Sequence, residues 1–168
     1  RIQETTGTTF IIVTHDQEEA MTVASRIAVM NHGDLVQIAT PGDIYETPNS
    51  RYVANFIGDV NAFEGKVAAL NGGTVEIEWA GGGRFKAKAP AEPLSMGQQV
   101  WLALRPEKLR IGLTKPAGTN NMVSGRVDDV GYLGSTSQYH TVLSNGQRIT
   151  VLRQNAAQSV ESNIKWED

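Results

Sequence analysis

The sequence predicts an α/β segment followed by a small all-β domain, and three observations support this division. An apolar run at residues 10–13 leads directly into a histidine and then into a helix start. Beyond Asp59 the spacing of apolar residues changes from a helical period to a period of two. In that second part, turn residues recur about every eight to twelve positions, as in small barrels and sandwiches.

The first element is predicted to be a strand at residues 10–13, where the sequence FIIV is uninterrupted by polar residues. Such runs are typical of strands covered on both faces in a parallel sheet. His15 would then lie at the carboxyl end of the strand, where open α/β sheets bind ligands, and it is the best candidate for chemistry. A lone histidine at a strand end is more often structural, so spacing alone leaves both roles open.

A helix is predicted to begin at Gln17, because Asp16 is a suitable N-cap and Glu19 would complete a capping box. Apolar residues then recur at helical spacing. A strand pattern resumes at residues 27–30, and a turn at residues 31–34 joins it to a second strand. Residues 8–30 therefore predict a strand, a helix and a strand in that order.

Two short helices are predicted before residue 58. Thr40 as N-cap and Pro41 at the first helical position predict the start of one helix, which Pro48 ends. A second helix is expected at residues 50–57, with Tyr52 and Phe56 in the core, and Gly58 ends it. The domain boundary is placed here, between residues 1–58 and 59–168.

Eight strands are predicted beyond Asp59. They cover residues 63–70, 74–79, 84–89, 99–104, 109–113, 121–130, 136–143 and 147–152. Asn145-Gly146 is the clearest hairpin signal. Gly81–Gly83 lies between two strand patterns and is predicted to be a hairpin turn, not a phosphate cradle.

Composition excludes several classes of protein. The chain of 168 residues has 40% hydrophobic residues, no apolar run near the roughly 18 residues of a membrane span, and no export signal. Zero cysteines exclude disulfides and fit a cytoplasmic location. Residues 1–58 hold three Lys/Arg against seven Asp/Glu, and residues 59–168 hold twelve against eleven. Without a dense basic patch, no nucleic-acid partner is expected.

Three histidines are too widely separated for a recognisable metal site, so none is predicted. A hydrolase in which Asp16 assists His15 is also disfavoured. Adjacent residues at a strand-to-helix bend point apart, and no serine or cysteine lies in a nucleophile elbow.

The string FIIVTHDQEEA, followed by SRIAVMNHGDLVQIATPGDIYETP, resembles the end of the nucleotide-binding domain of ATP-binding cassette import ATPases. The resemblance implies that residues 1–58 are an α/β remnant of a P-loop ATPase domain. It also implies that His15 is the switch histidine, which contacts the γ-phosphate of ATP and helps position the attacking water. Phosphoryl transfer depends on such positioning. ATP and Mg²⁺ are the cofactors implied for the intact protein.

Other parts of such an ATPase are missing from the sequence. It contains no G-x-x-x-x-G-K-[ST] phosphate loop, no LSGGQ-like signature and no acidic strand end before His15. We therefore expect a C-terminal piece of a longer protein that does not hydrolyse ATP alone and carries no cofactor itself.

The segments NAFEGKV, LALRPEKLRI and GRVDDVGYLGSTSQYHTVLSNGQRI resemble the TOBE region of importer ATPases. This implies an OB-fold-like barrel at residues 59–168 that joins two ATPase subunits as a homodimer and receives regulatory signals. RPEK, residues 105–108, is interpreted as a structural connection in which Pro106 ends a strand and Arg105 pairs with a carboxylate. The family continues beyond the sequence at residue 168 with a closing strand, so the last barrel is expected to be truncated.

The combination VNAFEG, ALRPEK, YLGSTSQYH and QNA resembles the polyamine branch, most closely the ATPases of putrescine importers. Membrane permease subunits, and a place at the inner face of the cell membrane, are implied for the intact transporter. Residues 8–38 are expected to be ordered by packing on the barrel or by exchange with a second copy.

The alternative is a free-standing OB-fold module that binds a small anion or an oligonucleotide, because fold does not fix function. Stacking on bases would need exposed aromatic residues. The available ones alternate with apolar neighbours, which indicates that several are core: Trp79, Phe85, Trp101, Tyr132, Tyr139 and Trp166.

Overall fold

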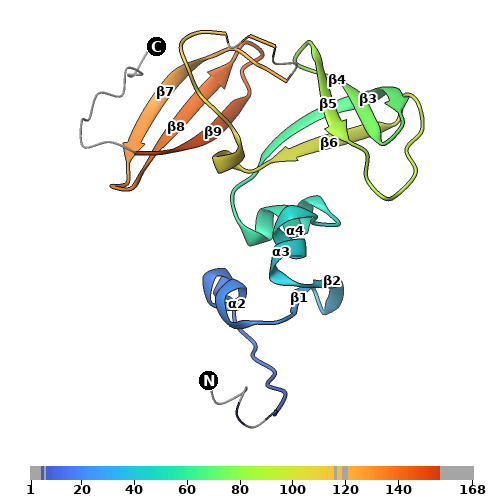
Figure 1. Cartoon of the computed structure of the whole chain (residues 1–168), viewed down its shortest axis with the longest axis vertical. Helices are drawn as coiled ribbons and strands as arrows, with labels where there is room; N and C mark the ends of the chain where they lie inside the picture. The colour runs from blue at the N-terminus through green and yellow to red at the C-terminus, as the bar shows by residue number, and fades with distance from the viewer. Residues whose placement is uncertain (1–4, 6, 116, 119–120, 156–168) are drawn as a thin grey trace. The chain divides into compact units, whose positions relative to one another are not determined.

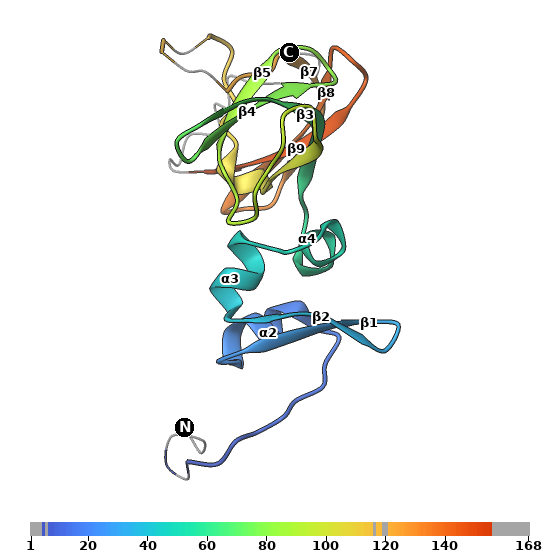
Figure 2. The same cartoon turned by 90° about the vertical axis from the view of Figure 1, so that its right-hand side faces the viewer.

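A computed structural model describes residue 5 and residues 7–115, 117–118 and 121–155 of the chain. The chain forms two compact units, Arg1–Gly58 and Asp59–Asp168 (Figures 1 and 2). The division falls where the apolar period of the sequence changes from helical to two. Among the described residues, no helix is long and apolar enough to cross a membrane.

The described part of unit 1 (Arg1–Gly58) is a β-hairpin packed with short helices. Its elements are α2 (Gln17–Val23), β1 (Ile27–Asn31), β2 (Asp34–Ala39), α3 (Pro41–Glu46) and α4 (Arg51–Ile57). The strands β1 and β2 pair in antiparallel fashion. A small core collects one face of the hairpin and the inner faces of α3 and α4, formed by Ile27, Val29, Ile44, Val53 and Ile57.

Helices α2 and α3 begin at the predicted N-caps, Asp16 and Thr40. The Asp16 carboxylate accepts a hydrogen bond from the Glu19 amide at 3.0 Å, and the Thr40 hydroxyl accepts one from the Asp43 amide at 3.2 Å. Ser50 caps α4 in the same way. Only half of the predicted capping box forms, because the Asp16 amide donates to Thr14 Oγ1 at 3.0 Å.

The predicted strand at residues 10–13 is wrong for this structure. The segment has no regular secondary structure, and its four apolar side chains are between 54% and 95% exposed. A strand needs a neighbour to satisfy its backbone groups, and no strand of the described residues pairs with this one. The FIIV run therefore has the composition of a buried strand without the sheet that would bury it.

The prediction that Tyr52 and Phe56 are core residues is also wrong. Each is 37% exposed, and their rings stack on each other with centroids 5.9 Å apart. α4 instead buries Val53, Ala54 and Ile57. Both aromatic residues lie beside this buried face of α4. They stay partly exposed because the core of unit 1 is too small to cover them.

Unit 2 (Asp59–Asp168) contains two antiparallel sheets, drawn as separate groups of arrows in Figure 1. The first sheet has the order β5-β4-β3-β6, with β3 (Asn61–Asn71), β4 (Thr74–Trp79), β5 (Arg84–Lys88) and β6 (Gln99–Leu104). The second has the order β7-β8-β9, with β7 (Gly125–Tyr132), β8 (Thr136–Leu143) and β9 (Arg148–Gln154). A 3₁₀ turn, η1 (Pro106–Lys108), packs against β9.

A shared core joins the two sheets. Phe63 lies edge-on to Trp79 and Phe85, at centroid distances of 5.7 and 5.3 Å. From the second sheet, Tyr139 and Val151 belong to the same buried cluster. The sheets therefore close over one apolar interior, which confirms the predicted mostly-β, barrel-like domain.

The aromatic residues considered in the sequence differ in how far they are buried. Trp79, Phe85 and Tyr139 are buried, as expected, and Trp101 is half-buried. Tyr132 is 64% exposed. Trp166 lies outside the described residues.

Two predicted strand positions in unit 2 are wrong. Residues 109–113 have no strand structure, although Leu109 and Ile111 pack against the core. The strand expected at residues 121–130 is instead β7 and begins only at Gly125. Before Gly125, the Asn121 side chain is bonded to β5 rather than continuing the β7 ladder. The hairpin turn at Asn145-Gly146 is confirmed between β8 and β9.

Candidate functional site

His15 is exposed and lies immediately before the N-cap of α2. Within the part of the chain that the structure describes, its ring has no hydrogen-bond partner. The local chain direction is set by its two neighbours, because the Thr14 hydroxyl accepts from the Asp16 amide and the Asp16 carboxylate accepts from the Glu19 amide. An imidazole held at a helix entry, with both nitrogens available, is able to donate to an anionic ligand. Its role in contacting ATP remains a prediction.

Asp16 acts as a helix cap. Its Oδ1 accepts from the Glu19 amide, and this bond directs the carboxylate toward the backbone of α2. This is the structural role predicted from the sequence, and it leaves no dyad with His15.

The other histidines are placed elsewhere. His32 occupies the β1–β2 turn with φ of 49°, followed by Gly33 at φ of 91°. His140 Nδ1 lies 3.3 Å from the Thr150 hydroxyl in the second sheet. No group of three potential metal ligands converges among the described residues.

Arg105 is a structural residue at the end of β6. It is 6% exposed, and its Nη1 donates to the backbone carbonyl of Asp59 at 3.1 Å. Pro106 begins η1, so the strand ends where the sequence predicted. The predicted carboxylate partner of Arg105 stays a prediction.

Unit 2 contains an internal repeat that sequence reasoning did not identify. NAFEGKV at residues 61–67 matches NMVSGRV at residues 121–127. Both copies precede a bulge in the ladder, after Val67 and after Val127. Both also carry a glycine where a Cβ would collide with the neighbouring strand, 2.3 Å from the Glu78 oxygen at Gly65 and 2.7 Å from the Val142 oxygen at Gly125. The pattern N-x-x-x-G-[KR]-V, which both copies share, is the sequence signal from which the repeat could have been found.

The asparagine of each copy binds the outer edge of the other sheet. Asn61 donates from Nδ2 to the Thr150 carbonyl and accepts at Oδ1 from the Thr150 amide, both at 2.8 Å. Asn121 does the same with the Lys86 carbonyl and amide, both at 2.7 Å. Each amide side chain therefore replaces one residue of a neighbouring strand, on β9 and on β5 respectively.

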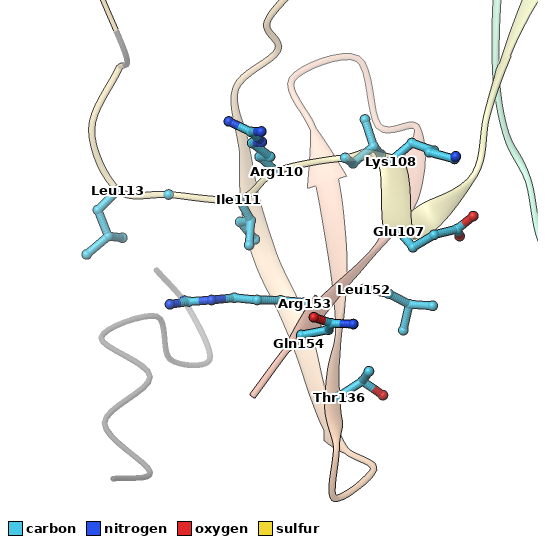
Figure 3. A pocket seen from close by; sticks show the side chains of 11 residues that line it. Glu107, Lys108, Arg110, Ile111, Leu113, Thr136, Leu152, Arg153 and Gln154 are labelled. Atoms are coloured by element: carbon cyan, nitrogen blue, oxygen red, sulfur yellow. The ribbon is translucent and has the colours of Figure 1, made fainter. Parts of the chain in front are cut away.

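A groove of about 910 Å³ lies in unit 2 between β9 and the segment that follows η1 (Figure 3). One wall is formed by residues 107–113, and the other by residues 152–154 together with Thr136. Arg110 projects from the first wall and Arg153 from the second (Figure 3). Sequence reasoning did not identify this groove, because its walls are more than 20 residues apart along the chain and only folding brings them together.

Residues 102–168 match the model of the TOBE domain family. The match begins inside β6, so it covers less of unit 2 than the predicted range of 59–168.

The chain is similar over nearly its whole length to curated ATP-binding proteins. It is 48% identical over 156 residues to a spermidine/putrescine import ATP-binding protein of Rubrobacter xylanophilus, covering 92% of this chain and 40% of that protein. It is 42% identical over 168 residues to a putrescine transport ATP-binding protein of Escherichia coli K12, covering 99% of this chain and 44% of the relative. The chain thus spans about two fifths of the length of these relatives.

Among solved structures, the cytoplasmic molybdate-binding protein ModG matches with a TM-score of 0.54 and 22% identity, over 64% of this chain and 84% of ModG. This similarity is evidence for the fold alone. It confirms the mostly-β, OB-fold-like part of the predicted architecture. The domain match and the sequence relatives together show that the chain carries a TOBE domain and is similar to the ATP-binding proteins of spermidine and putrescine importers.

Proposed function

We propose that this chain belongs to the ATP-binding subunit of a polyamine importer, with putrescine as the solute. Unit 1 is then the end of an α/β nucleotide-binding domain of the P-loop type, and unit 2 is its regulatory TOBE domain. The names of the relatives support the transported class, since they describe spermidine/putrescine import and putrescine transport.

The single observation that carries this proposal is the exposed FIIV run before His15. Ile11 and Val13 are 90% and 95% exposed, although both are strongly apolar. Burying a side chain of this kind stabilises a protein by about 1.5–3 kcal/mol. A parallel sheet formed with further strands would bury the run on both faces and satisfy its backbone groups.

The β1–β2 hairpin offers a second apolar surface of the same kind. Its inner face carries Ile27 and Val29 and packs within unit 1. Its outer face consists of two cross-strand pairs, Ala28 with Ile38 and Met30 with Leu35, and these side chains are exposed. A hairpin that is apolar on both faces suits the interior of a layered α/β domain better than its surface.

In such a sheet His15 would lie at the carboxyl end of its strand, where ligands bind. We assign it the γ-phosphate contact and the positioning of the attacking water. Its function is to donate a hydrogen bond at a fixed place, because electrostatic stabilisation and orientation are what phosphoryl transfer requires.

ATP and Mg²⁺ are proposed as ligands of the complete subunit. Mg²⁺ would neutralise charge on the β- and γ-phosphates. In P-loop ATPases the phosphate loop contributes to holding this ion, and the sequence contains no such loop. His15 is the one residue of this chain assigned to the nucleotide.

A homodimer through unit 2 and an association with membrane permease subunits complete the proposal. The permease association is supported by the names of the relatives, which describe import. The homodimer rests on the resemblance of unit 2 to the TOBE region, and the subunit would then lie in the cytoplasm at the inner face of the membrane.

The alternative of a free-standing oligonucleotide-binding module is less well supported. Stacking on bases requires exposed aromatic platforms. Trp79, Phe85 and Tyr139 are buried in the shared core instead.

A chimeric transporter tests the role of His15. The matching region of the Escherichia coli putrescine relative is replaced by this chain, and ATP hydrolysis is compared for the native and His15→Ala forms. We expect a loss of about hundredfold or more, as for removal of one transition-state hydrogen-bond donor. ATP binding should change much less.

His32→Asn is the matched control in the same chimera. Asparagine tolerates the left-handed backbone of the turn, so this variant removes an exposed imidazole without strain. It should keep the native rate. An unchanged rate in His15→Ala would remove His15 from the mechanism.

A further inference from the structure

The outer edge of β9 is blocked at one position and open at the next two. Strand β9 pairs through its odd-numbered residues with β8, as the hydrogen bonds that continue the ladder at Gln147 and Asn155 indicate. Its even-numbered residues therefore direct their backbone groups away from β8. Asn61 binds those groups at Thr150. The outward groups of Leu152 and Gln154 have no such partner among the described residues.

These open positions lie in the groove described above. Leu152 and Gln154 line it, and Leu109, Ile111 and Leu113 contribute apolar surface from the opposite wall. The volume of about 910 Å³ is within the range of about 300–1,000 Å³ that ligand sites have. An unpaired strand edge facing apolar pockets is the arrangement by which β-augmentation binds an extended peptide.

The lining of the groove carries three cationic side chains, Lys108, Arg110 and Arg153, against the single carboxylate of Glu107, and this balance indicates the chemistry of that peptide. Arg110 and Arg153 are exposed on opposite walls, and within the described chain neither has an ion-pair partner. The equivalent edge strand of the other sheet differs, because Lys86 and Arg84 lie 3.3 and 3.9 Å from the Glu76 carboxylate. Unpaired guanidinium groups bind carboxylates through paired, charge-assisted hydrogen bonds.

We propose that the β9 edge at Leu152 and Gln154 is a docking site for an extended, acidic segment of a partner protein. The backbone of the segment pairs with Leu152 and Gln154, and its carboxylates reach Arg110 and Arg153. Asn61 limits the length of the paired segment, because it occupies the edge at Thr150. This site belongs to unit 2 alone and does not depend on the proposed ATPase function.

Titration with a synthetic peptide tests the site. The probe is a blocked hexapeptide of alternating glutamate and valine, added to the full chain at low salt, and amide shifts are followed by NMR. We expect saturable shifts at Leu152 and Gln154. The double variant Arg110→Gln, Arg153→Gln should bind at least about tenfold more weakly than the native chain, because the charge-assisted bonds are lost. Both side chains are exposed, so the fold should be retained.

Three controls distinguish this proposal from simpler binding. Arg84→Gln removes a cation on the other edge strand and should leave the affinity unchanged. A probe methylated on alternate backbone nitrogens should fail to bind, because it cannot pair with the edge. A probe with glutamine in place of glutamate should bind about as weakly as the native probe binds to the double variant.

Several results would overturn the proposal. One is the absence of binding. Another is equal binding by the methylated or the glutamine probe. Inorganic tripolyphosphate that produces the same shifts with equal affinity would indicate an anion site without peptide recognition, and the docking proposal would then be wrong.

Discussion

The two units of the chain differ in how far they bury their apolar side chains. Unit 2 has a core of eight buried residues between two sheets, with Phe63 only 2% exposed. Unit 1 has a core of five residues and leaves the FIIV run and the outer face of its hairpin in water. The difference teaches that unit 2 has the structure of an independent domain, whereas unit 1 has the surface of a part that packs against something larger.

The largest effect that separates the units should come from one phenylalanine in each. Phe63→Ala should destabilise unit 2 by about 3–5 kcal/mol, because it removes a buried ring that contacts Trp79 and Phe85 and leaves a cavity. Phe10→Ala, at a position 54% exposed, should change stability by less than about 0.5 kcal/mol. Chemical denaturation followed by far-ultraviolet circular dichroism measures both, because all three tryptophans lie in unit 2 and their fluorescence would not report on unit 1. Similar losses in the two variants would remove the distinction between the units.

A smaller effect should come from the asparagines of the internal repeat. Asn61→Ala leaves the Thr150 amide and carbonyl of a part-buried edge without partners, so we expect a loss of about 2–3 kcal/mol. Asn121→Ala removes the same pair of bonds at an exposed edge and should cost about 1 kcal/mol, because water replaces the amide. Urea denaturation measures both losses in unfolding free energy, which follow from the shifts in midpoint if the dependence on urea concentration is unchanged. A larger loss for Asn121→Ala would contradict the idea that burial decides the cost.

The cap of α2 should have a smaller effect again. Asp16→Ala removes the bond to the Glu19 amide and should destabilise unit 1 by about 1 kcal/mol. Asp34→Ala, at the exposed first residue of β2, is the comparison variant and should have little effect. Hydrogen exchange of the amides in α2 reports the local change. If protection in α2 is unaltered by Asp16→Ala, the helix depends on contacts other than its cap.

The smallest effect on the chain itself is expected at Val13, which is 95% exposed. Val13→Asp should leave its unfolding free energy within about 0.5 kcal/mol of the native value. In the chimeric transporter, where the proposal buries this side chain in a sheet, the same change should abolish folding or activity, because a buried charge is costly. Expression, urea denaturation and ATP hydrolysis compare the two contexts. A fully active Val13→Asp chimera would show that the FIIV run stays in water.

The sequence alone was sufficient for features that depend on neighbouring residues. The N-caps at Asp16 and Thr40, the turn at Asn145-Gly146 and the end of β6 at Pro106 lie where they were predicted. Each depends on a hydrogen bond or a backbone restriction within a few residues, which the local sequence determines. The resemblance to importer ATPases also rests on short segments of sequence, and the sequence relatives confirm it.

Tertiary structure decided whatever depends on residues that are distant along the chain. FIIV has the composition of a buried strand, but pairing requires neighbours that the described chain does not provide. Tyr52 and Phe56 have helical core spacing, yet the interior of unit 1 is too small to cover them. The Asn61–Thr150 pair joins positions 89 residues apart, and the groove lined by Arg110 and Arg153 exists only because η1 packs against β9. Local sequence determines caps, turns and periods, whereas burial and edge pairing depend on which surfaces meet.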